Sequence, residues 1–256
     1  MRNIIDSRAR ACTYLAALCL FLVQMPLEAK TEGAIGKVNF LEGKAFVQRA
    51  GTDSYAPLTV GAPIYRNDRI RTSEASRLEI RFNDGSVLRL APNTQIRMRL
   101  IRKGKDSEKT KTSSGESKRL RVKLLLGKVW SVVNRAVGQE EVFRVQTPNA
   151  VAGVRGTRFQ TTYSKEQGTG VKVYDGKVLV SNKPIYAQSG KKQERVQVAG
   201  PAEISKQEWS EIVAAAMEYV RVLADGTMSQ KASFTLAKND LWESWNLARD
   251  KSQGLH

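Results

Sequence analysis

Short segments with β-type alternation, separated by glycine turns, occupy the chain from Gly36 to Asn182. Asp-Gly pairs at residues 84–85 and 175–176 each join two such segments, and glycine accepts the positive φ that a tight hairpin turn requires. Turns are also predicted at Glu42–Gly43 and at Gly127. The motif repeats without a fixed period, which argues against a regular long solenoid. We therefore expect a mainly β fold, either a compact sandwich or a short irregular β-solenoid of about ten to twelve strands.

Alternation along these segments predicts which side chains face the core, because successive side chains of a strand point to opposite sides. In residues 77–82 one face carries Leu78, Ile80 and Phe82, and the other carries Arg77, Glu79 and Arg81. The hairpin around Gly176 predicts a matching inward set, with Lys172 and Lys177 turned outward. This inward set consists of Val171, Val173, Val178 and Val180.

Residues 183–256 predict an α-rich extension with two short helices. Ser205 and Glu208 form a capping box, and apolar residues at helical spacing continue to Met217, so the first helix is expected over residues 206–217. A short strand and a turn at Asp225–Gly226 follow, and residues 239–251 predict the second helix. Its tryptophans, Trp242 and Trp245, are expected to pack on the β-unit, because large aromatic side chains usually lie in cores. A partner-binding stripe or a sugar-binding platform is the alternative.

The inventory of reactive side chains excludes whole classes of function. The sole histidine is His256, and the two cysteines, Cys12 and Cys19, lie near the N-terminus. A catalytic triad, a Cys/His dyad and a histidine- or thiolate-built metal site therefore lack their essential groups. We expect no metal, no cofactor and no enzymatic activity, although a hydrolase that uses two carboxylates survives this filter.

The N-terminus predicts an export signal at residues 1–29. Three arginines precede an apolar run of about 15 residues, which is shorter than the roughly 20 residues of a bilayer-spanning helix. Cleavage after Ala29 is expected, with a retained anchor or a buried helix as alternatives. The mature protein would then be periplasmic or secreted, without a transmembrane span. Loss of three basic and two acidic residues would leave a net charge of +16 from the original +17.

Residues 102–119 contain Ser, Thr, Gly and many cations but no apolar residue, so we expect an exposed, disordered insertion. It serves either solubility or electrostatic contact with an anionic partner, such as an envelope polymer, an anionic lipid or an acidic protein. Nucleic acid is not expected, because the insertion has no aromatic residue for base stacking. The residues predicted to make this contact are Arg102, Lys103, Lys105, Lys109, Lys111, Lys118, Arg119 and Arg121.

Five segments resemble the FecR domain in order and spacing: residues 61–72, 76–98, 124–133, 143–163 and 171–180. The most distinctive is the pattern TP-x-A-x-x-x-V-R-G-T-x-F. The resemblance implies an all-β domain, and FecR-like regulators are periplasmic sensors that relay an outer-membrane transporter signal to a sigma factor. Only about ten residues precede the apolar run, so we do not expect the cytoplasmic sigma-binding segment of those regulators.

The FecR-like motif is expected to form a corner between two strands. Gly153 and Gly156 can adopt backbone angles closed to other residues, or permit close approach of another segment. Arg155 between them needs partners for its donors, either backbone carbonyls or a carboxylate such as Asp68 or Asp84. A structural role is favoured over a ligand-binding loop. The motif residues are Thr147, Pro148, Gly153, Arg155, Gly156, Thr157 and Phe159.

The sequence thus predicts a signal peptide (1–29), a FecR-like β-domain (33–182) and a C-terminal extension (183–256). Its expected function is that of an exported, non-catalytic interaction or sensory module of the cell envelope, taking part in signal transduction. Its partner would be an envelope protein or an anionic envelope polymer. A structural envelope protein that binds a polyanion or glycan is the alternative.

Overall fold

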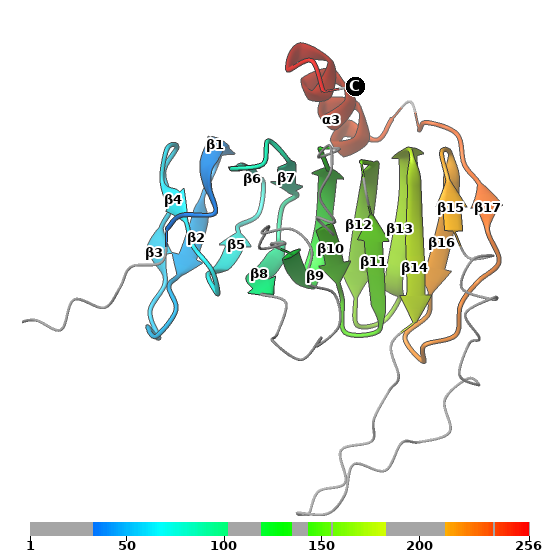
Figure 1. The fold of residues 1–256 in the computed structure, drawn as a ribbon, viewed down its shortest axis with the longest axis horizontal. Coiled ribbons are helices and arrows are strands. Elements are labelled where there is room, and N and C mark those ends of the chain that lie inside the picture. The colour runs from blue at the N-terminus through cyan, green and yellow to red at the C-terminus, as the bar shows by residue number, and fades with distance from the viewer. Residues whose placement is uncertain are drawn as a thin grey trace, which may run out of the picture. The chain divides into compact units, whose positions relative to one another are not determined.

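The computed structural model describes residues 33–101, 119–134, 143–154, 156–182, 213–237 and 239–255. The chain divides into two units, Met1–Gly33 and Ala34–His256, and every element described below belongs to the second (Figure 1). In this described part, no helix has the length and apolar character needed to cross a membrane. The predicted signal peptide lies outside the described residues, as does the insertion up to residue 118.

Two sheets, A and B, contain the strands, and the long strand β9 (Arg119–Val132) takes part in both. All pairings are antiparallel except that of β9 with β10. In order of pairing, sheet A consists of β4 (Pro63–Ile64), β1 (Gly36–Glu42), β6 (Arg77–Phe82), β7 (Val87–Leu90), the second half of β9, β12 (Arg158–Ser164), β13 (Gly168–Asp175), β16 (Glu218–Val222) and β17 (Ala232–Ser233). Sheet B consists of β3 (Ala56–Pro57), β2 (Ala45–Gln48), β5 (Arg69–Thr72), β8 (Gln95–Ile101), the first half of β9, β10 (Phe143–Gln146), β11 (Ala150–Val154), β14 (Lys177–Asn182) and β15 (Val213–Ala215).

Gly127 marks the point where β9 passes from sheet B to sheet A. Residues up to Leu126 pair with β8, and residues from Gly127 onward pair with β12. The φ of Gly127 is +95°, and a Cβ there would lie 2.5 Å from Thr94 Oγ1. The sequence predicted a turn between two strands at this position. The structure instead has one continuous bent strand, because each half of β9 has its own set of hydrogen-bonding neighbours.

One apolar core lies between the inner faces of the two sheets. It takes alternate residues from both, as the sequence predicted for the inward sets of β6, β13 and β14. These residues are almost fully shielded from solvent and include Val38, Leu78, Ile80, Leu88, Val171 and Val173 from sheet A and Val47, Ile70, Ile96, Leu124, Val145 and Val178 from sheet B. The sandwich is therefore a single hydrophobic unit held by both sheets.

Helix α3 (Leu241–Ser252) packs on the outer face of sheet A. Asp240 caps its N-terminus by accepting hydrogen bonds from the backbone N–H groups of Trp242 and Glu243. Trp242 packs with Trp130 of β9 and Ala91, while the ring of Trp245 lies 5.7 Å from that of Phe40. The predicted second helix and the packing of its tryptophans are confirmed.

The mainly β prediction is also confirmed, with differences in detail. Fourteen strands lie between residues 36 and 182, more than the expected ten to twelve, because two-residue strands such as β3 and β4 carry no alternation pattern. The predicted first helix is wrong at its C-terminal end: Val213–Ala215 is strand β15, which pairs with β14. Residues 206–212 of that helix lie outside the described residues. The predicted strand and turn before α3 are confirmed as β16 and the turn at Gly226.

Candidate functional site: a cationic sheet face

Thr147 and Pro148 of the FecR-like motif belong to the turn between β10 and β11. Thr147 is buried, and its hydroxyl accepts a hydrogen bond from the Ala150 N–H and lies 2.7 Å from the Thr169 hydroxyl. The amide of Asn149 donates to the carbonyls of Val222 and Leu223 in β16 and the turn after it. Pro148 is exposed. These contacts fix the turn against strands from elsewhere in the chain, which is a structural role.

Strand β11 of sheet B ends at Val154 and β12 of sheet A begins at Arg158, so the chain changes sheets here, as the predicted corner requires. Gly156 has a φ of +62°, a conformation that favours glycine. Gly153 differs from the prediction, since its φ is not positive and a Cβ there would meet no atom within 4 Å. Thr157 and Phe159 are buried.

Arg155 lies outside the described residues, so its predicted partners stay a prediction. The two carboxylates suggested for it have other contacts. Asp68 accepts hydrogen bonds from Arg49 and from the Tyr65 N–H, and Asp84 accepts one from the Ser86 N–H in its own turn.

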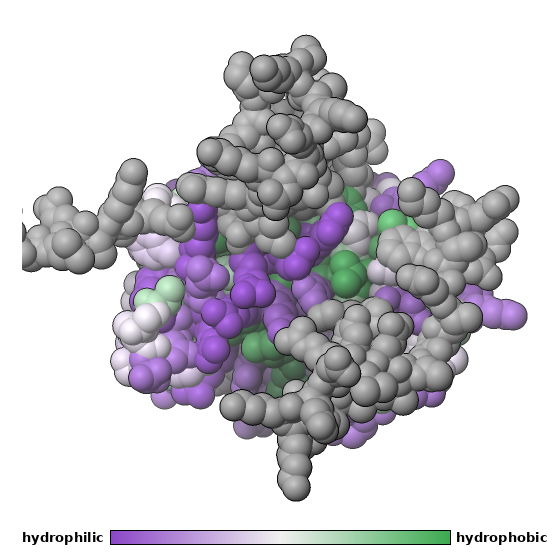
Figure 2. Space-filling view, turned by 60° about the horizontal axis from the view of Figure 1, so that its bottom comes forward, coloured by the Kyte–Doolittle hydropathy of each residue, from purple (hydrophilic) through white to green (hydrophobic). Residues whose placement is uncertain are grey.

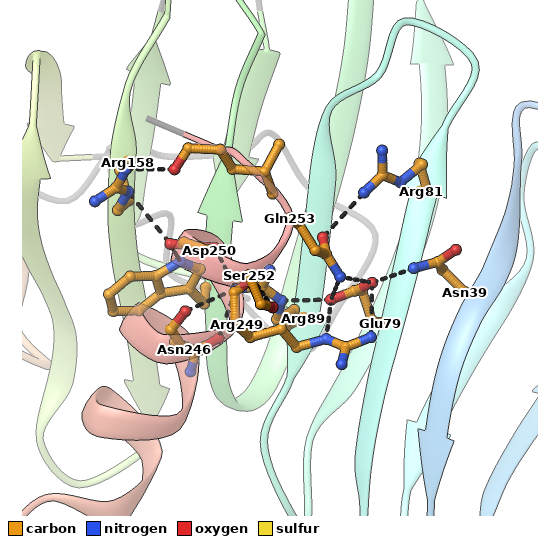
Figure 3. A network of polar contacts seen from close by, with 12 residues as sticks. Asn39, Glu79, Arg81, Arg89, Arg158, Asn246, Arg249, Asp250, Ser252 and Gln253 are labelled. Carbon is orange, nitrogen blue, oxygen red and sulfur yellow. Dashed lines mark hydrogen bonds and ion pairs between the residues drawn. The ribbon is translucent and has the colours of Figure 1, made fainter.

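A network of charged side chains fills the space between sheet A and α3 (Figure 3). Arg89 of β7 is fully buried and donates to Glu79 of β6 at 2.7 Å and to Asp250 of α3 at 2.5 Å. Arg249 of the helix also donates to Glu79, and Arg158 of β12 pairs with Asp250 at 3.2 Å. The helix is thus fixed to the sheet through alternating positive and negative groups.

Opposite pKa shifts mark the two acids of this network. Burial alone would raise the pKa of Glu79, but hydrogen bonds from Arg249, Arg89, Asn39 and Gln253 outweigh it and lower that pKa to about 2. For Asp250, burial outweighs the attraction of Arg89 and Arg158, and its pKa is raised. Glu79 is therefore held firmly as a carboxylate, whereas the ionised form of Asp250 is less favoured.

A second acid of the helix, Glu243, lies nearer its N-terminus and is also buried. Its nearest cation is Lys172 of β13, with 3.8 Å between the Lys172 Nζ and the Glu243 carboxylate. Tyr174 lies nearby; burial, followed by the charge of Glu243, raises the pKa of its hydroxyl. The charged groups on this face of sheet A therefore attach the helix.

The outer face of sheet B has a different composition. Its strand segments, counting residues 119–126 of β9, contain no Asp or Glu at all. Eight basic side chains of the described strand residues alternate there with buried core residues and so point away from the core; one, Lys177, lies apart on β14, and the other seven lie on β5, β8, β9 and β10. We call these seven the cationic face: Arg69, Arg71, Arg97, Arg99, Arg121, Lys123 and Arg144. In the view of Figure 2, a broad area of hydrophilic residues occupies the side where Figure 1 places β2, β3 and β5.

Strand register arranges six of these cations in two rows that cross the strands. In the first row Arg69 of β5 faces Arg97 of β8, which faces Lys123 of β9. In the second row Arg99 of β8 faces Arg121 of β9, which faces Arg144 of β10. Adjacent strands lie about 4.8 Å apart, so neighbouring charges of a row are close.

The environment of Arg121 is electrostatically unfavourable. Burial lowers the pKa of its guanidinium, and the positive charges of Arg144 and Arg99 lower it further. Its neighbour in hydrogen-bonding range is the neutral side chain of Gln146, at 3.5 Å. Like-charge neighbours without a carboxylate among the strands of this sheet favour association with an anion.

The predicted anion-contacting residues coincide with this face only in part. Arg121 lies at its centre, and Arg119 begins β9, though its side chain is not described. The other six, Arg102, Lys103, Lys105, Lys109, Lys111 and Lys118, lie outside the described residues, in the segment that joins β8 to β9. Sequence reasoning missed the other six members of the surface: Arg69, Arg71, Arg97, Arg99, Lys123 and Arg144. Each alternates with apolar neighbours, but only the pairing of β5, β8, β9 and β10 brings them together.

No group of His, Cys, Asp or Glu residues suited to holding a metal occurs in the described ranges. The cationic face instead presents guanidinium and ammonium groups, whose chemistry suits oxyanions.

The family model described as FecR protein matches residues 68–179, which include the whole cationic face. Two crystal structures of a protein described as a candidate anti-sigma factor from Parabacteroides distasonis are similar to the chain. The first is 19% identical over 68% of this chain and 63% of that one, with a TM-score of 0.44. The second is 20% identical over 64% and 59%, with a TM-score of 0.41. The chain thus spans less than two thirds of either structure, and at this distance the likeness carries no function over. No curated protein matches the chain.

Proposed function

We propose, from the FecR domain that residues 68–179 form, that this protein is a non-catalytic interaction or sensory module of the cell envelope, and that its cationic face binds an anionic partner. The observation that carries the proposal is the charge of sheet B: the seven outward cations of the cationic face lie in strands that contain no acidic residue. A surface of one sign attracts ligands of the other and raises their rate of encounter.

A non-catalytic role is consistent with the carboxylates of the described residues. Glu79 and Asp250, the acids of the helix network, are tied to arginines beneath α3. A pair of carboxylates that hydrolyses a glycoside needs to reach its substrate from opposite sides of the scissile bond. These acids instead hold a helix in place.

Export through the predicted signal peptide at residues 1–29 belongs to the same proposal. The mature protein would comprise a FecR-like domain at residues 33–182 and an extension at 183–256, located in the periplasm or outside the cell. N-terminal sequencing of the mature protein tests this, with a start near Lys30 expected. An intact Met1 in a membrane fraction would contradict it.

The binding role is tested by retention on an immobilised anionic matrix at low salt. Arg97→Gln/Arg121→Gln, which removes two charges of the cationic face, should elute at clearly lower salt than the wild type. The control Lys165→Gln/Arg221→Gln removes two charges from exposed positions outside sheet B. Equal elution of the two double variants would contradict the assignment of the binding surface, because net charge alone would then explain retention.

A further inference from the structure

We infer that the anionic partner is a linear polyanionic polymer that lies across the strands of sheet B, along the two rows of cations. This inference rests on the proposed function and adds the shape and class of the partner. It is carried by the register of β5, β8, β9 and β10, which turns six separate cations into two ordered lines.

The spacing of the cations in each row suits an extended anionic chain. Each holds three cations on three neighbouring strands, so three charges span about two inter-strand distances of roughly 4.8 Å each. The rows are two residues apart on each strand, since they use Arg97 and Arg99 of β8 and Lys123 and Arg121 of β9. A chain with closely repeating negative charges can occupy several of these positions at once, and each additional contact is then intramolecular.

Glutamines continue the first row at both ends. Gln48 of β2 faces Arg69, and Gln146 of β10 faces Lys123. Gln48 donates one amide N–H to the Thr52 carbonyl. Its second N–H and those of Gln146 can donate to the same oxygens that a guanidinium binds. The row therefore offers hydrogen-bond donors across five strands, and none of its positions carries a negative charge.

The chemistry of the rows suits phosphate, sulfate or carboxylate groups. Five of the six cations are arginine, whose planar guanidinium binds such oxyanions through paired hydrogen bonds. Arg71, the remaining cation of the face, lies instead over the rings of Tyr55 and Phe46, at 4.3 Å and 5.2 Å. It is therefore not assigned to a row.

Two other classes of partner fit the face less well. Peripheral membrane binding combines cations with apolar side chains that enter the lipid. The residues between the cations of the rows, Ile70, Met98 and Val122, instead point into the core, and the exposed Leu126 lies outside both rows. A protein partner would be expected to meet a desolvated aromatic or aliphatic centre. The centre of this face is instead Arg121 with its arginine neighbours.

The test uses phosphate chains of different length as probes: inorganic phosphate, tripolyphosphate and long-chain polyphosphate, titrated into the full mature protein by calorimetry. We expect affinity per phosphate to rise more than tenfold from inorganic phosphate to the long chain. Loss of the second row in Arg99→Gln/Arg121→Gln/Arg144→Gln should reduce polyphosphate affinity at least tenfold. It should also make the dependence of log affinity on log salt shallower by about 0.7–0.9 for each charge removed, as for other linear polyanions.

The matched control removes three charges outside the rows, in Lys44→Gln/Lys165→Gln/Arg221→Gln, and should retain most of the affinity. Thermal unfolding of both triple variants verifies that they fold. Vesicles containing phosphatidylglycerol serve as a second probe.

The outcomes separate this inference from the proposed function. If vesicles bind more tightly than polyphosphate and lose affinity in the second-row variant, the polymer is not the partner, but the cationic face remains a binding surface. Equal affinity per phosphate for all three chain lengths would also contradict the inference that the partner is a polymer. If the affinity of every probe is unchanged in the second-row variant, both the polymer inference and the proposed binding role of the cationic face are wrong.

Discussion

The two outer faces of this sandwich carry similar outward charges in opposite circumstances. On sheet A, Arg89 and Glu79 are fully buried and joined to Arg249 and Asp250 of a covering helix. On sheet B, Arg99, Arg121 and Arg144 stand side by side in strands that contain no acid. A buried charge must be paired, because an isolated one is very costly, whereas a solvated cation can remain available to a partner. The comparison shows that sheet A uses its charges to attach a helix, whereas the charges of sheet B are open to the partner that we propose.

The largest expected effect comes from breaking the network on sheet A. Arg89→Ala should lower the free energy of unfolding by about 3–5 kcal/mol, because it leaves Glu79 and Asp250 buried without their shared cation. Urea unfolding measures the change. The matched variant on the other face, Arg99→Ala, should cost less than about 0.5 kcal/mol, since Arg99 is exposed. Similar losses for both would remove the distinction between the faces.

The acid dependence of stability sharpens the same comparison. The pKa of Glu79 is lowered from 4.5 to about 2 in the folded protein. Its contribution, on the order of 3 kcal/mol, is therefore complete above its ordinary pKa of 4.5 and is lost as the pH falls toward 2. Asp250 acts in the opposite direction: its pKa is raised, so its ionised form weakens the fold and protonation removes that cost.

Glu79→Gln should accordingly be less stable than the wild type at pH 7, with the difference shrinking as the pH is lowered to 3 and below. Unfolding at both pH values measures this. The control Glu42→Gln removes an exposed acid of the same sheet and should show little change at either pH. A difference for Glu79→Gln that is constant with pH would contradict the assigned pKa.

The third prediction concerns Gly127, where strand β9 passes from sheet B to sheet A. Gly127→Val should cost about 1–3 kcal/mol or more, because valine resists positive φ. Its Cβ would also meet the Thr94 Oγ1 at 2.5 Å and the Thr94 Cα at 2.7 Å. The control is Gly153→Ala, where a Cβ meets nothing within 4 Å and φ is not positive. Thermal unfolding should separate the two clearly; equal losses would show that β9 does not depend on its bend.

The smallest effect on stability is expected for a substitution on the cationic face, and the size of that effect should depend on salt concentration. Arg121 is partly buried and lies beside the like charges of Arg144 and Arg99, and salt screens their repulsion. Arg121→Gln should therefore be as stable as the wild type or slightly more stable at low salt, by less than about 0.5 kcal/mol, with the difference vanishing at high salt. Thermal unfolding at low and high ionic strength measures it. A marked loss of stability would mean that Arg121 is a structural residue.

Local pattern was sufficient to predict much of this protein. Alternation identified Leu78, Ile80 and Phe82 as inward residues, because strand side chains alternate whatever lies around them. Positive φ at Gly43, Gly85 and Gly176 followed from their turn contexts. The motif around Gly156 indicated both a corner and a resemblance to the FecR domain, whose family model matches residues 68–179. The composition of residues 239–251 predicted helix α3.

Long-range pairing decided the rest. Val213–Ala215 has apolar residues at helical spacing, yet it becomes a strand because β14 offers it an open edge. Glu79 alternates outward as predicted but is buried, because a helix some 170 residues away in sequence covers it. The rows on sheet B likewise exist only through the register of four strands. The sequence by itself determined which side of each strand is polar, since that is a property of neighbouring residues. Only the tertiary structure decided whether a polar side is covered or left open, because that depends on which distant segment packs against it.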